Sequence, residues 1–312
     1  MLKIIVILIF ALMAIVPAFA AKKNPITDNS FTGQLDSIKT ELAEMPKMPN
    51  SKYVSQSQLR DLLKDSNPEI RKAAVKNSKT IIGNSTVYRL VIDIFENNSE
   101  RLDIRIEAAK ALSYGTGASR VTSALTDAVK YENDSTSLKI MTYKALWKAA
   151  ASRSATQSFL VNALKYEEKD PQVKKAVIWS LFAASKNSRV YKALVDLLKY
   201  GKDDNSVKIE AIKSLYTAMG QSTVKSLMLD IAKYKDSPQD KELRKTAILA
   251  LSGVNDSRVN NLLEDLFKYN EDTEIRETAL EATMKDQFKM NEFFHLNYAL
   301  GNGSVFNPIE KE

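Results

Sequence analysis

The sequence predicts an all-α chain built as an α-solenoid of about seven stacked helical hairpins. The prediction depends on three columns of residues that recur in one phase about every 34 positions. In the first column an aliphatic residue precedes a base, with spacings of 34, 34, 35, 34, 36 and 32: Ile70-Arg71, Ile104-Arg105, Leu138-Lys139, Val173-Lys174, Val207-Lys208, Leu243-Arg244 and Ile275-Arg276. The second column is serine, at Ser51, Ser85, Ser119, Ser154, Ser188, Ser222 and Ser257. The third is a leucine-rich run that ends in tyrosine, at Tyr131, Tyr166, Tyr200, Tyr234 and Tyr269.

The first twenty residues have the pattern of a secretory signal. Lys3 is the positive start, residues 4–16 are apolar, and Ala18-Phe19-Ala20 is a small-x-small cleavage site. The apolar run is shorter than a membrane-spanning helix, and no cysteine follows it that would accept a lipid. We therefore expect cleavage after Ala20 and a mature chain that is secreted or periplasmic and not an integral membrane protein. Residues 21–50 are expected to form a tether, with one short helix over residues 31–44.

Residues 51–285 are expected to hold the seven hairpins, starting near 51, 85, 119, 154, 188, 222 and 257. The repeated serine is expected to cap the first helix through its hydroxyl. The Leu-x-x-Leu-Leu spacing then gives that helix one apolar stripe, and its final tyrosine is expected to pack under the turn between the helices. Pro68 and Pro171 suit the first turn of a second helix, because proline lacks the N–H that would be unsatisfied there. Glycines at the end of the second helix are expected to form left-handed caps: Gly83, Gly115, Gly117, Gly220 and Gly253.

The second helix resembles that of HEAT repeats, whose pattern is Asp-Pro-x-Val-Lys/Arg-x-x-Ala-x-x-Ala/Ser-Leu. The pattern is kept best over residues 204–215 and 240–251, although the period is shorter than is usual for that family. The resemblance implies a right-handed superhelix whose second helices line a concave surface. It also implies that the repeated base is structural and ties neighbouring repeats through acids, for which Asp170, Asp204, Asp240 and Asp272 are the candidates. This ladder of bases comprises Arg71, Arg105, Lys139, Lys174, Lys208, Arg244 and Arg276.

After the repeats, residues 286–312 carry five aromatic side chains, and we expect them to cap the last hairpin. Terminal repeats need a cover because no further repeat buries their outer face. The aromatic residues are Phe288, Phe293, Phe294, Tyr298 and Phe306.

Composition excludes several kinds of site. The 312 residues contain no cysteine and one histidine, His295, so disulfides, thiol nucleophiles and Cys/His zinc sites are ruled out. We expect no catalytic residue, no metal and no cofactor. The formal net charge is +7, which suits anionic partners or solubility, and export makes nucleic acid an improbable partner.

One helical face supplies the candidate partner-binding residues. At about 100° per residue, Glu210, Lys213 and Thr217 lie opposite the apolar stripe of their helix, on the expected concave side. The same positions in other repeats form a basic row with one Trp at the fourth repeat, which either faces the groove or packs between repeats. The candidates are Trp179, Lys76, Lys110, Lys144, Lys148, Lys213 and Tyr114.

These residues favour a non-enzymatic, exported scaffold that binds an acidic or amphipathic segment of a partner protein in its concave groove. One alternative is a binder of an anionic polymer, either an envelope glycopolymer or nucleic acid. A less favoured alternative is an enzyme, because some HEAT-like proteins are metal-dependent hydroxylases. Those hydroxylases use repeated His-Glu pairs, and a single His295 cannot supply them.

Overall fold

A computed structural model describes residues 56–131, 135–234 and 240–284. All of them belong to one unit, Ser55–Glu312. The expected signal, tether and aromatic cap lie outside the described residues.

The regular elements of the described residues are all helices, and these residues contain no strand. They form seven hairpins, numbered here 1 to 7, each made of a first and a second helix. The hairpins are α3 (Gln56–Leu63) with α4 (Pro68–Ser78), α5 (Ser85–Glu96) with α6 (Leu102–Leu112), α7 (Ser119–Tyr131) with α8 (Thr136–Ala145), α10 (Ser154–Asn162) with α11 (Pro171–Leu181), α12 (Ser188–Tyr200) with α13 (Asn205–Leu215), α14 (Ser222–Tyr234) with α15 (Lys241–Ala250), and α16 (Ser257–Tyr269) with α17 (Thr273–Met284). The α-solenoid prediction is confirmed.

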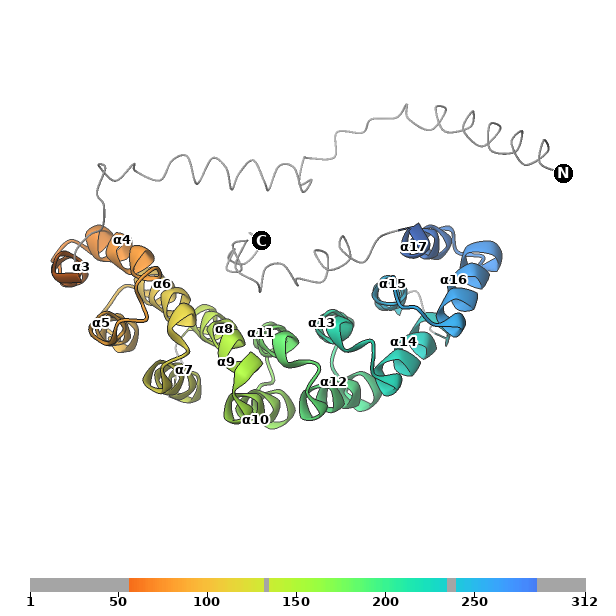
Figure 1. The fold of residues 1–312 in the computed structure, drawn as a ribbon, viewed down its shortest axis with the longest axis horizontal. Coiled ribbons are helices and arrows are strands. Elements are labelled where there is room, and N and C mark those ends of the chain that lie inside the picture. Colours follow the sequence, from red (N-terminus) through yellow and green to blue (C-terminus); the bar gives the residue numbers. More distant parts are fainter. Residues whose placement is uncertain (1–55, 132–134, 235–239, 285–312) are drawn as a thin grey trace, which may run out of the picture. The chain divides into compact units, whose positions relative to one another are not determined.

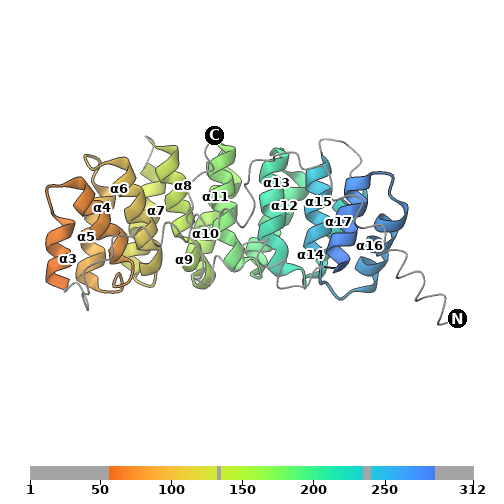
Figure 2. The same ribbon diagram turned by 90° about the horizontal axis from the view of Figure 1, so that it is seen from above.

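Within this unit the helices form two layers (Figure 1). The second helices make the inner layer, in which each packs against the second helix of every hairpin next to it. The first helices make the outer layer and touch one another less. Seen from above, the hairpins follow one another in chain order (Figure 2). The core therefore runs between the layers from one hairpin to the next, as in other solenoids.

The helix starts follow from local capping. Pro68 and Pro171 lie in the first turn of α4 and α11, as predicted. The residue before each proline, Asn67 or Asp170, accepts hydrogen bonds from the first backbone N–H groups of its helix. The prediction that the repeated serine caps the first helix is wrong by one position. Ser85, Ser188 and Ser257 are the first helical residues, and the capping side chain belongs to the residue before each of them, namely Asn84, Asn187 and Asp256.

The predicted left-handed glycine caps are also wrong, except at one position. Gly253 has a φ of 70°, and no other glycine of the described residues has a positive φ. Several second helices end instead in a short 3-10 turn, which satisfies the last carbonyls without a left-handed residue. These turns are η2 (Ser113–Gly115), η4 (Phe182–Ala184) and η5 (Tyr216–Ala218).

Hairpin 3 departs from this pattern at the end of its second helix. The segment from Leu138 to Ser154 is one residue longer than the equivalent segment from Ile104 to Ser119. In place of a 3-10 turn the chain forms a further short helix, α9 (Trp147–Ser152), which packs against η2, α10, α11 and η4. Hairpin 4 is irregular as well, because α10 continues into a π-helical turn, η3 (Ala163–Glu167).

Candidate functional site

The structure places Trp179 between hairpins. Its side chain is 7% exposed and packs in a cluster with Trp147 and Phe182. The Trp179 and Phe182 rings are tilted with centroids 5.5 Å apart, while Trp147 and Phe182 stack at 6.2 Å. Of the two positions left open by the sequence, the exposed one is therefore wrong, because α9 and η4 supply ring surface that covers Trp179.

The lysines of the predicted basic row differ in their neighbours. Lys110 forms an ion pair with Glu107 at 2.7 Å, and Lys213 lies 3.9 Å from Glu210; in both cases the acid is three residues earlier on the same helix. At the corresponding place Lys76 has Ala73 and Lys144 has Met141. Within the described residues neither of these two lysines forms an ion pair.

Lys144 lies over the edge of the buried cluster. Its Nζ is 5.8 Å from the centroid of the Trp179 ring, within the range of a cation–π contact. Burial lowers the pKa of Lys144, while the carboxylate of Glu210 raises it and the charge of Lys175 lowers it further. Lys144 is thus a half-buried cation held against an aromatic ring.

Lys148 and Tyr114 come together one turn further along. The Nζ of Lys148 lies 4.3 Å from the Tyr114 ring centroid and 5.2 Å from that of Trp147. Tyr114 belongs to hairpin 2 and its side chain is 41% exposed. Burial lowers the pKa of Lys148 too, and in the described residues its ammonium group has no hydrogen-bonding or ionic partner.

We call these side chains together the aromatic–lysine cluster; it comprises Tyr114, Lys144, Trp147, Lys148, Trp179 and Phe182. It spans hairpins 2 to 4 on the inner layer. The sequence pointed to four of its members as partner-binding residues. Trp147, Phe182 and Tyr216 occupy equivalent positions in successive hairpins, and all three are buried.

Six of the seven bases of the ladder have one of two kinds of partner, either an acid of the next hairpin or a backbone carbonyl of their own hairpin. Three of them form ion pairs with an acid in the interhelix segment of the next hairpin: Arg71 with Glu100 at 2.7 Å, Lys139 with Glu168 at 2.8 Å and Lys174 with Asp203 at 2.5 Å. Three others donate to a backbone carbonyl of the first helix of their own hairpin: Arg105 to Phe95, Arg244 to Ala232 and Arg276 to Phe267. For Lys208 the described residues give no ion pair.

The acceptors expected for this ladder were wrong. Asp170, Asp204 and Asp272 use their carboxylates to cap the helices that follow them. Asp240 accepts a hydrogen bond from Asn205 at 3.0 Å. Where a ladder base forms an ion pair, it reaches forward to the next hairpin, so its acid lies about 29 residues later in the chain instead of four residues earlier.

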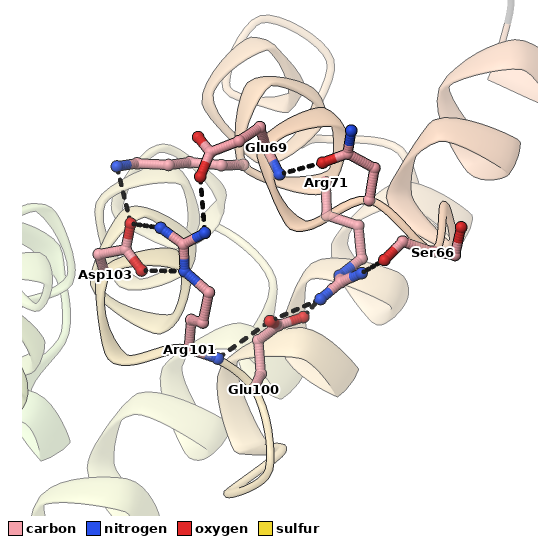
Figure 3. A network of polar contacts seen from close by, with 8 residues as sticks. Ser66, Glu69, Arg71, Glu100, Arg101 and Asp103 are labelled. Carbon is pink, nitrogen blue, oxygen red and sulfur yellow. Dashed lines mark hydrogen bonds and ion pairs between the residues drawn. The ribbon is translucent and has the colours of Figure 1, made fainter.

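A second network joins hairpins 1 and 2 (Figure 3). The guanidinium of Arg101 bridges Glu69 at 2.6 Å and Asp103 at 2.9 Å, and Lys72 also reaches Asp103, at 2.8 Å. Arg71 donates to both oxygens of Glu100 and to the backbone carbonyls of Asp65 and Ser66. A depression of about 420 Å³ beside this network is lined in part by Arg71 and Glu100, whose charges are already satisfied. The network therefore joins hairpins and leaves little charge for a ligand.

The repeated tyrosines lie in the solvent. Tyr166, Tyr200 and Tyr269 are 77%, 77% and 75% exposed, so the prediction that they pack under the interhelix turn is wrong. Each is at or just beyond the last turn of its first helix, where no apolar side chain of the interhelix segment covers it. The side chains of Tyr131 and Tyr234 lie outside the described part of the structure.

Comparison with known proteins bears on the fold. The family model described as HEAT repeats matches residues 201–284. Residues 201–284 are HEAT repeats. They include the segments 204–215 and 240–251, in which the sequence keeps the family pattern best.

The chain is also similar in structure to the crystal structure of the Escherichia coli protein YibA, with a TM-score of 0.48 and 16% sequence identity over 89% of this chain and 93% of that one. No curated protein matches the sequence. HEAT repeats generally mediate contacts between proteins, and this is the class of role that the family supports.

Two features are absent from the described residues. No helix among them has the length and apolar character needed to cross a membrane. No group of three or more His, Asp or Glu side chains in that part of the chain is placed to hold a metal ion.

Proposed function

We propose that the chain is an exported, non-enzymatic scaffold whose inner layer binds an acidic segment of a partner protein. The observation that carries the proposal is a set of lysines on that layer that form no ion pair within the described residues. Lys76, Lys144 and Lys148 project from the second-helix segments of hairpins 1 and 3, and none has an ion-pair partner among the described residues. An acidic segment would supply the missing charge.

The fold supports a scaffold role because consecutive second helices present one continuous inner face. A partner segment that runs along this face touches several hairpins at once, which suits an extended chain or a helix. Export is supported by the charged, apolar and small-x-small pattern of residues 1–20. Mass spectrometry of the mature protein tests export, since a chain that begins at Ala21 is expected and an intact Met1 would contradict it.

Photo-crosslinking from single positions tests the binding face. A photoreactive residue replaces Lys76 or Leu249 on the inner layer, and Lys192 or Asp230 on the outer layer as matched controls. We expect one partner protein to be captured from the inner positions and not from the outer ones. The purified partner should then bind the purified scaffold. Capture from the outer layer alone, or equally from both layers, would contradict the proposal.

The same uncompensated lysines favour one other ligand, an anionic polymer. The two differ in their response to salt, because a polymer releases counterions and its affinity then falls steeply with ionic strength. An affinity that falls by less than tenfold between about 50 and 200 mM salt supports a protein segment, whereas a loss of about a thousandfold or more indicates a polymer.

A further inference from the structure

The inner layer has one place where two cations lie together without a carboxylate of the same helix. Three residues before the lysine, hairpins 2 and 5 carry Glu107 and Glu210, whereas hairpin 3 carries Met141. Lys144 therefore lacks the intrahelical acid that Lys110 and Lys213 have. Met141 is 5% exposed, so this position contributes to packing and not to charge.

The extra residue of hairpin 3 adds the second cation. It allows α9 to form, and α9 carries Lys148 four residues after Lys144, a spacing that places two side chains on the same side of helical backbone. In hairpins 4 and 5 the equivalent segments are the turns η4 and η5, with Ala183 and Thr217 at the position of Lys148. This pair of lysines is therefore peculiar to hairpin 3.

Aromatic rings hold both ammonium groups in place. Lys144 lies over Trp179 of hairpin 4, and Lys148 lies between Tyr114 of hairpin 2 and Trp147. Ring faces fix the position of a cation but do not accept its hydrogen bonds as a carboxylate does. Among the described residues, no group accepts a hydrogen bond from either ammonium group, so a carboxylate of a bound partner can supply the acceptor.

The surroundings favour an anion. Partial burial weakens the hydration of both ammonium groups. Of the carboxylates in the described residues, Glu210 of hairpin 5 acts on Lys144, and it also lies beside Lys213. Lys175 adds a further positive charge nearby. A half-buried charge that lacks a partner is stabilised strongly when one arrives, because hydrogen bonds to charged groups are stronger than neutral ones.

We propose that Lys144 and Lys148 form a carboxylate-binding subsite for Asp or Glu side chains of the partner segment, with an apolar neighbour of that acid packed on the exposed part of Tyr114. This inference rests on the proposed function and narrows it to hairpins 2 to 4. The partner segment is expected to combine acidic and apolar residues, since the subsite offers both kinds of surface.

Fluorescence anisotropy with the full mature chain tests the subsite. The probe is a short labelled peptide of alternating Glu and Leu, and its counterpart has Gln in place of every Glu. The test variant is Lys144→Gln/Lys148→Gln. The control variant is Lys192→Gln/Lys199→Gln, which removes the same charge from exposed lysines of α12 in the outer layer. Circular dichroism checks that both variants keep the helical content of the wild type.

We expect the Glu peptide to bind the wild type and the control equally, and to bind the test variant at least about tenfold more weakly. The Gln peptide should bind the wild type as weakly as the Glu peptide binds the test variant. Equal binding of the Glu peptide to both variants would overturn the subsite. Tighter binding of a thymidine oligonucleotide than of the Glu peptide would also overturn it, in favour of a phosphate polymer.

Failure of the subsite and failure of the proposed function give different results. If the inner layer still captures a partner in the crosslinking experiment while the double variant binds it as the wild type does, the subsite is wrong and the scaffold remains. If no inner position captures a partner, the scaffold itself is wrong.

Discussion

Tyr143 of α8 donates its hydroxyl to the carboxylate of Glu168 across 2.6 Å, and this bond joins hairpin 3 to the interhelix segment of hairpin 4. Both side chains are buried, at 1% and 7% exposure. Lys139 completes the contact with an ion pair to the same carboxylate at 2.8 Å. Burial raises the pKa of Tyr143, and the bond to Glu168 raises it further, so the hydroxyl remains a donor at neutral pH.

Replacement of Tyr143 by Phe should therefore destabilise the array. Glu168 would keep Lys139 but lose a buried hydrogen bond to a charged group, a loss of about 1.5–3 kcal/mol. Urea denaturation followed by circular dichroism measures the effect. The control is Tyr114→Phe, which removes a hydroxyl from a ring that is 41% exposed and should change the free energy of unfolding by less than about 0.5 kcal/mol. Equal stability of the two variants would show that the bond to Glu168 contributes nothing.

Acid should loosen the contact between hairpins 1 and 2 through Asp103. Burial opposes ionisation of this carboxyl, but hydrogen bonds from Lys72 and Arg101 outweigh burial and lower its pKa from 3.8 to about 2. Because the folded pKa lies below the unfolded one, the unfolded chain takes up the proton first. The contribution of Asp103 is therefore complete above about pH 4 and is lost as the pH falls towards 2.

The contribution of Asp103 to the free energy of unfolding is small, because its side chain is 40% exposed and solvent screens its ion pairs. We expect a loss of at most about 1 kcal/mol. Hydrogen exchange of α4 and α6, compared across this pH range, measures it, and the difference should disappear in Asp103→Asn. An acid response of the same size in that variant would assign the effect to other carboxyls, of which Glu100 is the nearest with a lowered pKa.

The hairpin array was predictable because its signals are local and repeat. Apolar spacing, Pro68, Pro171 and the column of aliphatic residues each specify a helix by themselves, and seven copies remove the ambiguity of any one. The contacts between hairpins were less accessible. Lys174 pairs with Asp203 and not with Asp170, because the second helices stack so that a base meets the next interhelix segment.

The lysines of the candidate site could be predicted from the sequence, but the packing of its aromatic rings could not. A helical wheel of one repeat places Trp179 opposite the apolar stripe, which is correct for an isolated hairpin. It contains no information on α9, which comes from another hairpin and covers the ring. One available signal was missed: the segment from Leu138 to Ser154 is longer than each of its equivalents, and the extra length marks where the regular packing changes.

The exposed tyrosines should tolerate substitution. Tyr166→Ser and Tyr200→Ser remove rings that are each 77% exposed, so each should change the free energy of unfolding by less than about 0.5 kcal/mol. Thermal unfolding of the single and double variants measures this, and Phe182→Ala serves as the buried comparison, with an expected loss of about 3–5 kcal/mol. A comparable loss in the tyrosine variants would mean that these rings are packed in solution.

Substitution of Trp179 and substitution of Lys144 should affect different properties, stability in the first case and binding in the second. Trp179→Ala deletes a ring that is 7% exposed from the packing of hairpins 3 and 4, and should lower stability by about 3–5 kcal/mol. Lys144→Gln removes one cation–π contact at the edge of the same ring and should change stability by about 1 kcal/mol or less.

Chemical denaturation compares the stability of the Trp179→Ala and Lys144→Gln variants, with partner or peptide binding measured on the same samples. Leu249→Ala, in the equivalent column of hairpin 6, controls for truncation of a less buried side chain on the inner layer. We expect Trp179→Ala to lose stability and Lys144→Gln to lose binding. A Trp179→Ala chain that is as stable as the wild type but no longer binds would place the ring in direct contact with the partner, contrary to its packing between hairpins.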